Sequence, residues 1–149
     1  MSGCAETSAF SVSALGGIDA IRELLSDLCT QLDAMHFDAE SLGAFEIVLV
    51  EALNNVCEHA YVNGPGPFKV TCASKQDGLH ISIVDNGKPM PNNSLPVGDH
   101  PMADADPDDL PEGGFGWFLI YTLAEDVTYS RAENQNILSL RMAIHPANT

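Results

Sequence analysis

Apolar residues recur at two different spacings in the first 61 residues of the chain. Phe10, Val12 and Ala14 alternate with serines, which predicts a short strand. Apolar positions then recur every three or four residues, which predicts helices over about residues 19–34 and 40–61. We expect both apolar stripes to face a core, with a dimer seam as the alternative for the first. The first stripe consists of Ile18, Ile21, Leu25, Leu28 and Leu32, and the second of Leu42, Phe45, Leu49, Leu53, Val56 and Ala60.

The rest of the chain predicts two hairpins around one helix. A glycine-rich turn opens a strongly apolar helix over about residues 117–123. Residues 92–112 are rich in Pro, Asp and Gly without periodicity, which is typical of a functional or mobile loop. Strand patterns cover residues 68–74, 79–84, 127–131 and 137–144.

This order of elements favours an α+β fold. Strands that come as hairpins, with few helices, predict a two-layer α/β sandwich with a mixed, mostly antiparallel sheet and helices on one face. The chain has 149 residues, which is the usual size of one domain. We therefore expect a single domain over residues 1–149.

The charge of the chain restricts its partners. It carries 21 acidic and 6 basic residues, a formal net charge of -15. Nucleic acid and anionic membrane both require a cationic face, so we expect neither as a partner. A basic protein, or an anion neutralised by a metal ion, remains compatible with this charge.

The sequence also suggests a location. No apolar run is long enough to span a bilayer, and the first residues show no basic region followed by an apolar segment. We therefore expect a cytoplasmic protein whose four cysteines are reduced thiols, mostly filling the core.

Three polar residues stand one turn apart on the second predicted helix. Glu51, Asn55 and His59 follow at i, i+4 steps and share a face that we expect to lie away from the apolar stripe. A solvated helix side is the alternative. However, Asn54 and Asn55 are poor helix formers in the middle of a helix. An amide oxygen is a suitable ligand for Mg²⁺, and a carboxylate can accept a proton or orient a nucleophile.

Asp85 ends a predicted strand and precedes Asn86 and Gly87. This triplet is compatible with an ordinary turn. The alternative is a buried carboxylate that accepts a hydrogen bond from the amino group of adenine, where guanine presents a carbonyl and is repelled. Gly87 would then let the base approach the backbone.

A glycine-rich run, residues 113–116, opens the third predicted helix. Amide groups at a helix start, together with the positive end of the helix dipole, form an anion site. The alternative is a flexible end to the long loop.

A metal ligand, an adenine acceptor and a phosphate cradle are together the parts of a Mg-ATP site. The chain has no P-loop motif and no kinase H-R-D or D-F-G motif.

Three segments in this order resemble the motifs of the GHKL, or Bergerat-fold, ATPases. Residues 50–61 (VEALNNVCEHAY) resemble the N-box, residues 85–91 (DNGKPMP) the first glycine box, and residues 112–120 (EGGFGWFLI) the second. Among these ATPases the chain looks most like the anti-sigma factor serine kinases of the RsbW/SpoIIAB type. The resemblance extends over about residues 10–144.

This resemblance implies a Bergerat ATP-binding fold with ATP and Mg²⁺ as cofactors and an ATP lid at about residues 92–112. Glu51 would be the catalytic general base, and Asn55 would bind Mg²⁺. Asp85 would bind adenine, and glycine amides would hold phosphate oxygens. The residues expected at the nucleotide are Asn55, His59, Asp85, Gly87, Gly113, Gly114, Phe115, Gly116 and Trp117.

The resemblance also implies an activity and partners. We expect an ATP-dependent serine/threonine protein kinase and anti-sigma factor that binds a sigma factor and phosphorylates a STAS-domain antagonist. A homodimer is one arrangement that the family allows. The chain departs from the family pattern in two places. Pro89 replaces the second glycine of the first glycine box, which leaves Asp85 and Gly87 intact but stiffens the following turn. Residues 92–112 contain no Lys or Arg to stabilise charge in phosphoryl transfer, and this favours an alternative, a non-catalytic, nucleotide-gated partner-binding module.

Overall fold

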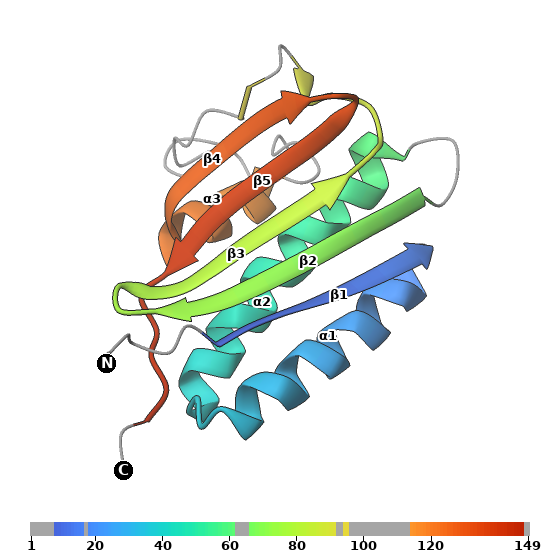
Figure 1. Cartoon of the computed structure of the whole chain (residues 1–149). Coiled ribbons are helices and arrows are strands. Elements are labelled where there is room, and N and C mark those ends of the chain that lie inside the picture. The colour runs from blue at the N-terminus through green and yellow to red at the C-terminus, as the bar shows by residue number, and fades with distance from the viewer. Residues whose placement is uncertain (1–7, 17, 62–65, 92–93, 96–113, 148–149) are drawn as a thin grey trace.

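The computed structural model describes residues 8–16, 18–61, 66–91, 94–95 and 114–147. Within these ranges, three α-helices cover one face of a five-stranded sheet (Figure 1). The predicted α+β sandwich is therefore confirmed, with the elements in the predicted order. They are β1 (Ser8–Gly16), α1 (Ile18–Ala34), α2 (Ala39–Asn55), the π-helical turn η1 (Val56–Ala60), β2 (Gly66–Lys75), β3 (Gly78–Asp85), α3 (Gly114–Leu123), β4 (Glu125–Ala132) and β5 (Gln135–Met142).

The sheet has the strand order β1-β2-β3-β5-β4, and each neighbouring pair is antiparallel. The strands β3 and β5 pair directly although α3 and β4 lie between them in the sequence (Figure 1). In this register Asp85, at the end of β3, stands opposite Asn136, near the start of β5. The topology thus brings the segment after β3 to the tip of the β4–β5 hairpin.

The core lies between the sheet and the helices, as the period-two and helical patterns predict. Alternate residues of β3 and β5 point into it, and α1 and α2 supply the opposite layer. Full burial of each large side chain stabilises the fold by about 1.5–3 kcal/mol. Of the three described cysteines, Cys72 is buried, whereas Cys29 and Cys57 are half-buried and pack against the core, so the expected core position holds fully for Cys72 alone among them. The buried side chains include Leu24, Leu28, Phe45, Leu49, Leu53, Cys72, Leu79, Ile81, Ile83, Leu138, Leu140 and Met142.

The second helix begins as its sequence suggests but ends differently. Asp38 caps α2, because its Oδ1 accepts a hydrogen bond of 2.7 Å from the backbone N–H of Ser41. The prediction of one continuous helix to Tyr61 is wrong in its last turn, which is π-helical. There the N–H of Tyr61 donates to the carbonyl of Val56, five residues earlier, at 3.2 Å.

None of the described helices is both long and apolar enough to cross a membrane.

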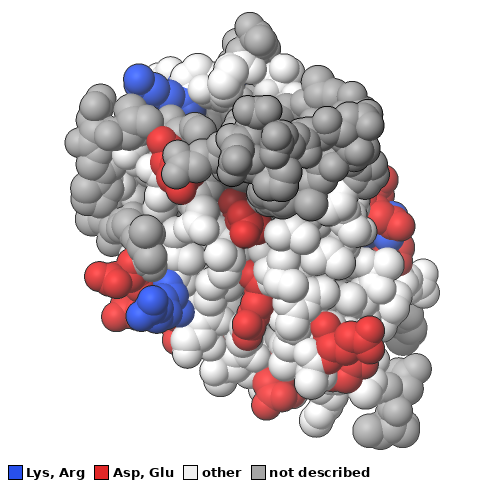
Figure 2. Space-filling model, turned by 180° about the vertical axis from the view of Figure 1, so that it is seen from behind, with Lys and Arg blue, Asp and Glu red and all other residues white. Residues whose placement is uncertain are grey.

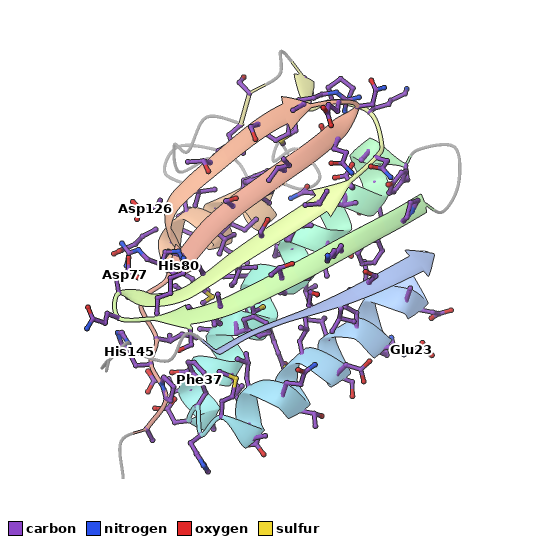
Figure 3. The ribbon with its side chains drawn as sticks, in the orientation of Figure 1. Glu23, Phe37, Asp77, His80, Asp126 and His145 are labelled. Carbon is purple, nitrogen blue, oxygen red and sulfur yellow. The ribbon has the colours of Figure 1, made fainter. Side chains whose placement is uncertain are left out.

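Charged side chains gather at the end of the sheet opposite Asp85. Arg141 lies 2.6 Å from Glu125 and 3.0 Å from Asp126, and His80 lies 2.6 Å from Asp77. Figure 3 shows Asp77, His80 and Asp126 close together beside the β2–β3 turn. These carboxylates are exposed, so each pair contributes little to stability. The cluster joins the β2–β3 turn to the β4–β5 hairpin.

Candidate functional site

A pocket lies between α2, the segment after β3 and the β4–β5 hairpin. Three residues predicted for the nucleotide site meet at it: Asn55, Asp85 and Trp117. Residues that the sequence places far apart thus share one hollow. Its apolar wall consists of Ala52, Val56, Ala60, Pro89, Met90, Trp117 and Leu138, and its polar lining of Asn55, Asp85, Lys88, Tyr129 and Asn136.

Asn55 is the last residue of α2 and brings an unpaired polar atom to this pocket. Its side-chain nitrogen is buried and has no hydrogen-bond partner. Such an atom costs about 1–3 kcal/mol when it stays unsatisfied, so its burial suggests a ligand. A half-turn of the carboxamide exchanges its oxygen and nitrogen without a change of shape, and the oxygen is a suitable Mg²⁺ ligand. The face of α2 that carries Asn55 therefore borders the core, contrary to the expectation that it lies away from the apolar stripe.

The described residues hold no cluster of three or more His, Cys, Asp or Glu side chains that could bind a metal ion. In nucleotide sites Mg²⁺ usually takes one or two protein ligands and completes its shell with phosphate oxygens and water. The carboxamide of Asn55 is chemically suited to be one such ligand.

Asp85 is buried at the end of β3, with 5% of its surface exposed. Its Oδ1 accepts hydrogen bonds from the backbone N–H of Gly87 at 2.9 Å and from Nδ2 of Asn136 at 2.8 Å. Burial raises the pKa of Asp85, while these two bonds and the nearby Arg131 counteract the rise. The bond from Gly87 makes the ordinary turn that the sequence suggested, and the carboxylate also lines the pocket.

Glu51 and Gly116 touch where α2 and α3 pack together. A Cβ atom added to Gly116 would lie 2.6 Å from Oε2 of Glu51, so the absence of a side chain makes room for the carboxylate. Glu51 is half-buried, one helical turn before Asn55, and Gly116 adjoins Trp117. The predicted base and one predicted phosphate-site glycine are therefore neighbours beside the pocket.

The remaining predicted residues are distributed as follows. Gly87 packs against the end of η1, where an added Cβ would lie 2.3 Å from the carbonyl oxygen of Ala60. Its lack of a side chain therefore has a packing role. His59 lies in η1, and Gly114 and Phe115 begin α3, but their side-chain surroundings lie outside the description. Gly113 and the predicted lid, apart from Ser94 and Leu95, also lie outside the described residues.

Three pocket-side residues on the β4–β5 hairpin escaped the sequence prediction. Tyr129 donates a hydrogen bond of 2.5 Å to Oδ1 of Asn136, and Arg131 donates one of 2.9 Å to the same atom. One signal was present in the sequence. Asn136 shares the two-residue period of Leu138 and Met142, so it is a polar residue at a core-facing position.

Comparison with known families identifies this architecture. A family model of the histidine kinase-like ATPase domain matches residues 16–142. The chain belongs to this family. The match confirms the predicted resemblance to the GHKL ATPases, and the fold and pocket of this ATPase domain are consistent with it.

The ATPase domain is also similar to bacterial proteins named serine-protein kinase RsbW. It is 30% identical to those of Bacillus cereus strain Q1 and Bacillus thuringiensis subsp. konkukian strain 97-27, and 31% identical to that of Bacillus cereus strain B4264. Each match extends over 105 residues, which is 70% of this chain and 66% of the relative. The matched region is therefore slightly under two thirds of the relatives' length.

Proposed function

We propose that this protein is an ATP-dependent serine/threonine protein kinase that also binds its protein partners as an anti-sigma factor. The observation that carries the proposal is the shared pocket of Asn55, Asp85 and Trp117, with Glu51 next to it. The similarity to serine-protein kinases of Bacillus supports it. The substrate would be a serine or threonine of a STAS-domain antagonist, and a sigma factor would be the second partner.

Each side chain has a role in this proposal. Asp85 would accept a hydrogen bond from the amino group of adenine, and the apolar wall with Trp117 would enclose the base. Asn55 would hold Mg²⁺, which would neutralise charge on the phosphates. Glu51 would take the proton of the attacking hydroxyl group. Gly114 and Gly116 would offer backbone amides at the start of α3 to phosphate oxygens.

The distribution of charge supports a basic protein partner. Residues 18–61 carry nine acidic side chains and one Arg, whereas the other described segments carry five acidic and five basic ones. Figure 2, which views the molecule from the helix side, shows acidic side chains spread over this face. A groove between α1 and α2 also lies here, and its lining includes Leu25, Cys29, Asp33, Leu42 and Glu46. The helix layer is therefore the surface we propose for partner binding.

One observation favours the alternative, a nucleotide-gated binding module without transfer. Arg131, a cation beside the pocket, is already bonded to the carbonyl of Gly87 at 2.8 Å and to Asn136. Residues 92–112 supply no Lys or Arg. Transfer would then depend on Mg²⁺ and on Lys88, a cation of the pocket lining, for positive charge near the phosphates.

Labelled ATP separates the two candidates. The protein, Mg²⁺ and a STAS-domain antagonist are incubated, and the label on the antagonist is measured. We expect transfer by the parent protein and by Glu133→Gln, which removes an exposed carboxylate from the β4–β5 turn outside the helix layer, but not by Glu51→Gln. All three should capture the partner equally. Tight nucleotide binding without any transfer by the parent would reject the kinase and leave the binding module.

A further inference from the structure

Asp85 and Asn136 are the two buried polar side chains in the part of the chain that the structure describes. They are direct partners in the antiparallel register of β3 and β5, and both occupy core-facing positions. Leucine or isoleucine would suit either position by the pattern of its strand. Two buried polar groups that face each other beside a pocket therefore call for an explanation beyond packing.

The orientation of the Asn136 carboxamide is fixed by its neighbours. The backbone N–H of Met90 donates to the hydroxyl oxygen of Tyr129 at 3.0 Å, so the hydroxyl proton points to Oδ1 of Asn136. Arg131, which has donors only, bonds to the same oxygen. The amide group of Asn136 is consequently turned toward Asp85, and a flip would place donors against donors.

This fixed amide group determines what Asp85 offers to a ligand. Nδ2 of Asn136 and the N–H of Gly87 both donate to Oδ1 of Asp85. These bonds leave Oδ2 as the acceptor for a ligand. The same side chains also hold the segment after β3, since Nδ2 of Asn136 donates to the carbonyl of Lys88 at 2.7 Å and Arg131 to that of Gly87.

We propose that Asn136, held by Tyr129 and Arg131, is a positioning residue. It orients the Asp85 carboxylate toward the exocyclic amino group of adenine. The inference rests on the proposed nucleotide site and deepens it by naming the residue that sets base selectivity. Asn136 acts through Asp85 and need not touch the base. The pocket would therefore recognise adenine through three linked side chains. Tyr129 on β4 bonds to Asn136, which bonds to Asp85.

Replacing Asn136 by aspartate tests this role through pH. The variant keeps the oxygen that accepts from Tyr129 and Arg131 but puts a second carboxylate against Asp85. Among the described residues, the charged and titratable groups around the pair are Arg131 and Tyr129 on β4, Lys88 in the segment after β3 and Tyr61 after η1. Two facing carboxylates share a proton at low pH, and the protonated carboxyl group of the variant then donates to Asp85, although the carbonyl of Lys88 loses the second amide proton that Asn136 supplies.

The probe is Mg-ATP or Mg-GTP, and the readout is the fluorescence of Trp117, the sole tryptophan, which lies at the pocket. At about pH 8 we expect Asn136→Asp to bind Mg-ATP about tenfold more weakly than the parent and to recover about threefold of this loss at about pH 6, where the bond to Asp85 returns but the bond to the Lys88 carbonyl does not. The matched control is Asn134→Asp, which makes the same change at an exposed turn residue. It should follow the parent at both pH values.

The outcomes separate this inference from the proposed function. If the parent does not bind Mg-ATP, both fail. If the parent binds and prefers ATP to GTP but Asn136→Asp matches Asn134→Asp at both pH values, the proposed nucleotide site stands and the positioning role is overturned. Should circular dichroism show that Asn136→Asp is unfolded, Tyr129→Phe decides. It should reduce the preference for ATP over GTP about threefold or more, and an unchanged preference would overturn the inference.

Discussion

The carboxylate of Glu51 occupies the space that a side chain at position 116 would need. Its Oε2 lies 2.6 Å from the Cβ position of Gly116, although Glu51 is on α2 and Gly116 is on α3. Real Cβ contacts are longer than this, so any larger residue at position 116 must displace the carboxylate. The place of the proposed general base therefore depends on a glycine in another helix.

Gly116→Ala should consequently slow phosphoryl transfer more than it weakens nucleotide binding. The added methyl group would push the Glu51 carboxylate away from the hydroxyl group it would deprotonate. We expect a loss of about tenfold or more in the transfer rate, with a change of less than about threefold in the affinity for Mg-ATP. Single-turnover transfer to the antagonist and Trp117 fluorescence measure the two quantities.

Gly43→Ala is the matched control. Gly43 is exposed in α2, and an added Cβ would have no atom within 4 Å. Alanine there should leave transfer unchanged and raise the free energy of unfolding by about 0.5–1 kcal/mol, because glycine is a poor helix former. If Gly116→Ala behaved like this control, the dependence of Glu51 on Gly116 would be refuted.

Asn55→Ala should weaken Mg-ATP binding without destabilising the fold. The side-chain nitrogen of Asn55 has no hydrogen-bond partner, so its removal relieves a buried unsatisfied group. We expect the affinity for Mg-ATP to fall about tenfold or more and the melting temperature without nucleotide to stay level or rise. A thermal-shift titration measures both, since a ligand bound by the folded state raises the melting temperature. Equal Mg-ATP affinity in variant and parent would contradict the metal role.

Asp85→Asn should change base selectivity. The new carboxamide retains an oxygen for the donors of Gly87 and Asn136, and its NH₂ group replaces the oxygen that would accept from adenine. Guanine presents a carbonyl at that place, so the preference for ATP over GTP should fall about tenfold or more. Competition titrations followed at Trp117 give this ratio. Asp77→Asn, at the exposed far end of the same hairpin, should keep the parent's preference.

Asp85 should also make stability depend on pH in a definite direction. Burial raises the pKa of Asp85 above its ordinary value, so the folded protein holds this proton more tightly than the unfolded chain. The associated stabilisation is full below the unfolded pKa and is lost as the pH rises through the folded one. The free energy of unfolding of the parent, minus that of Asp85→Asn, should therefore fall as the pH rises above about 4. Urea denaturation at a series of pH values measures this difference. A difference that does not change with pH would show that burial does not raise the pKa of Asp85.

Much of the fold was predictable because its patterns are local. The alternation in Leu138, Leu140 and Met142 and the helical spacing around Leu28 report which side of each element is buried. The proximity of Asn55 and Asp85 was accessible only through the order of three motifs, since no local pattern says that α2 and the end of β3 meet. The roles of the individual site residues remain predictions.

The residues that hold Asp85 were not predicted, and the reason is physical. Tyr129, Arg131 and Asn136 act through long-range contacts that depend on the pairing of β3 with β5 across an intervening helix and strand. A sequence shows which residues are unusual for their position but not which strand lies opposite. The π-helical turn was missed for a related reason, because Tyr61 bonds to Pro67 and Asn86, whose positions depend on β2 and β3.

The π-helical turn at Val56–Ala60 amounts to one surplus residue in an otherwise regular helix. Deleting a residue there would let α2 continue as an ordinary helix, but it would rotate everything that follows by about 100°. The carbonyl of Ala60 would then no longer meet the N–H of Lys88, which it now does at 2.9 Å. The length of this turn is therefore tied to the position of the segment after β3. A single-residue gap at this place in a distant homologue would mark a lineage that anchors the segment after β3 by other means.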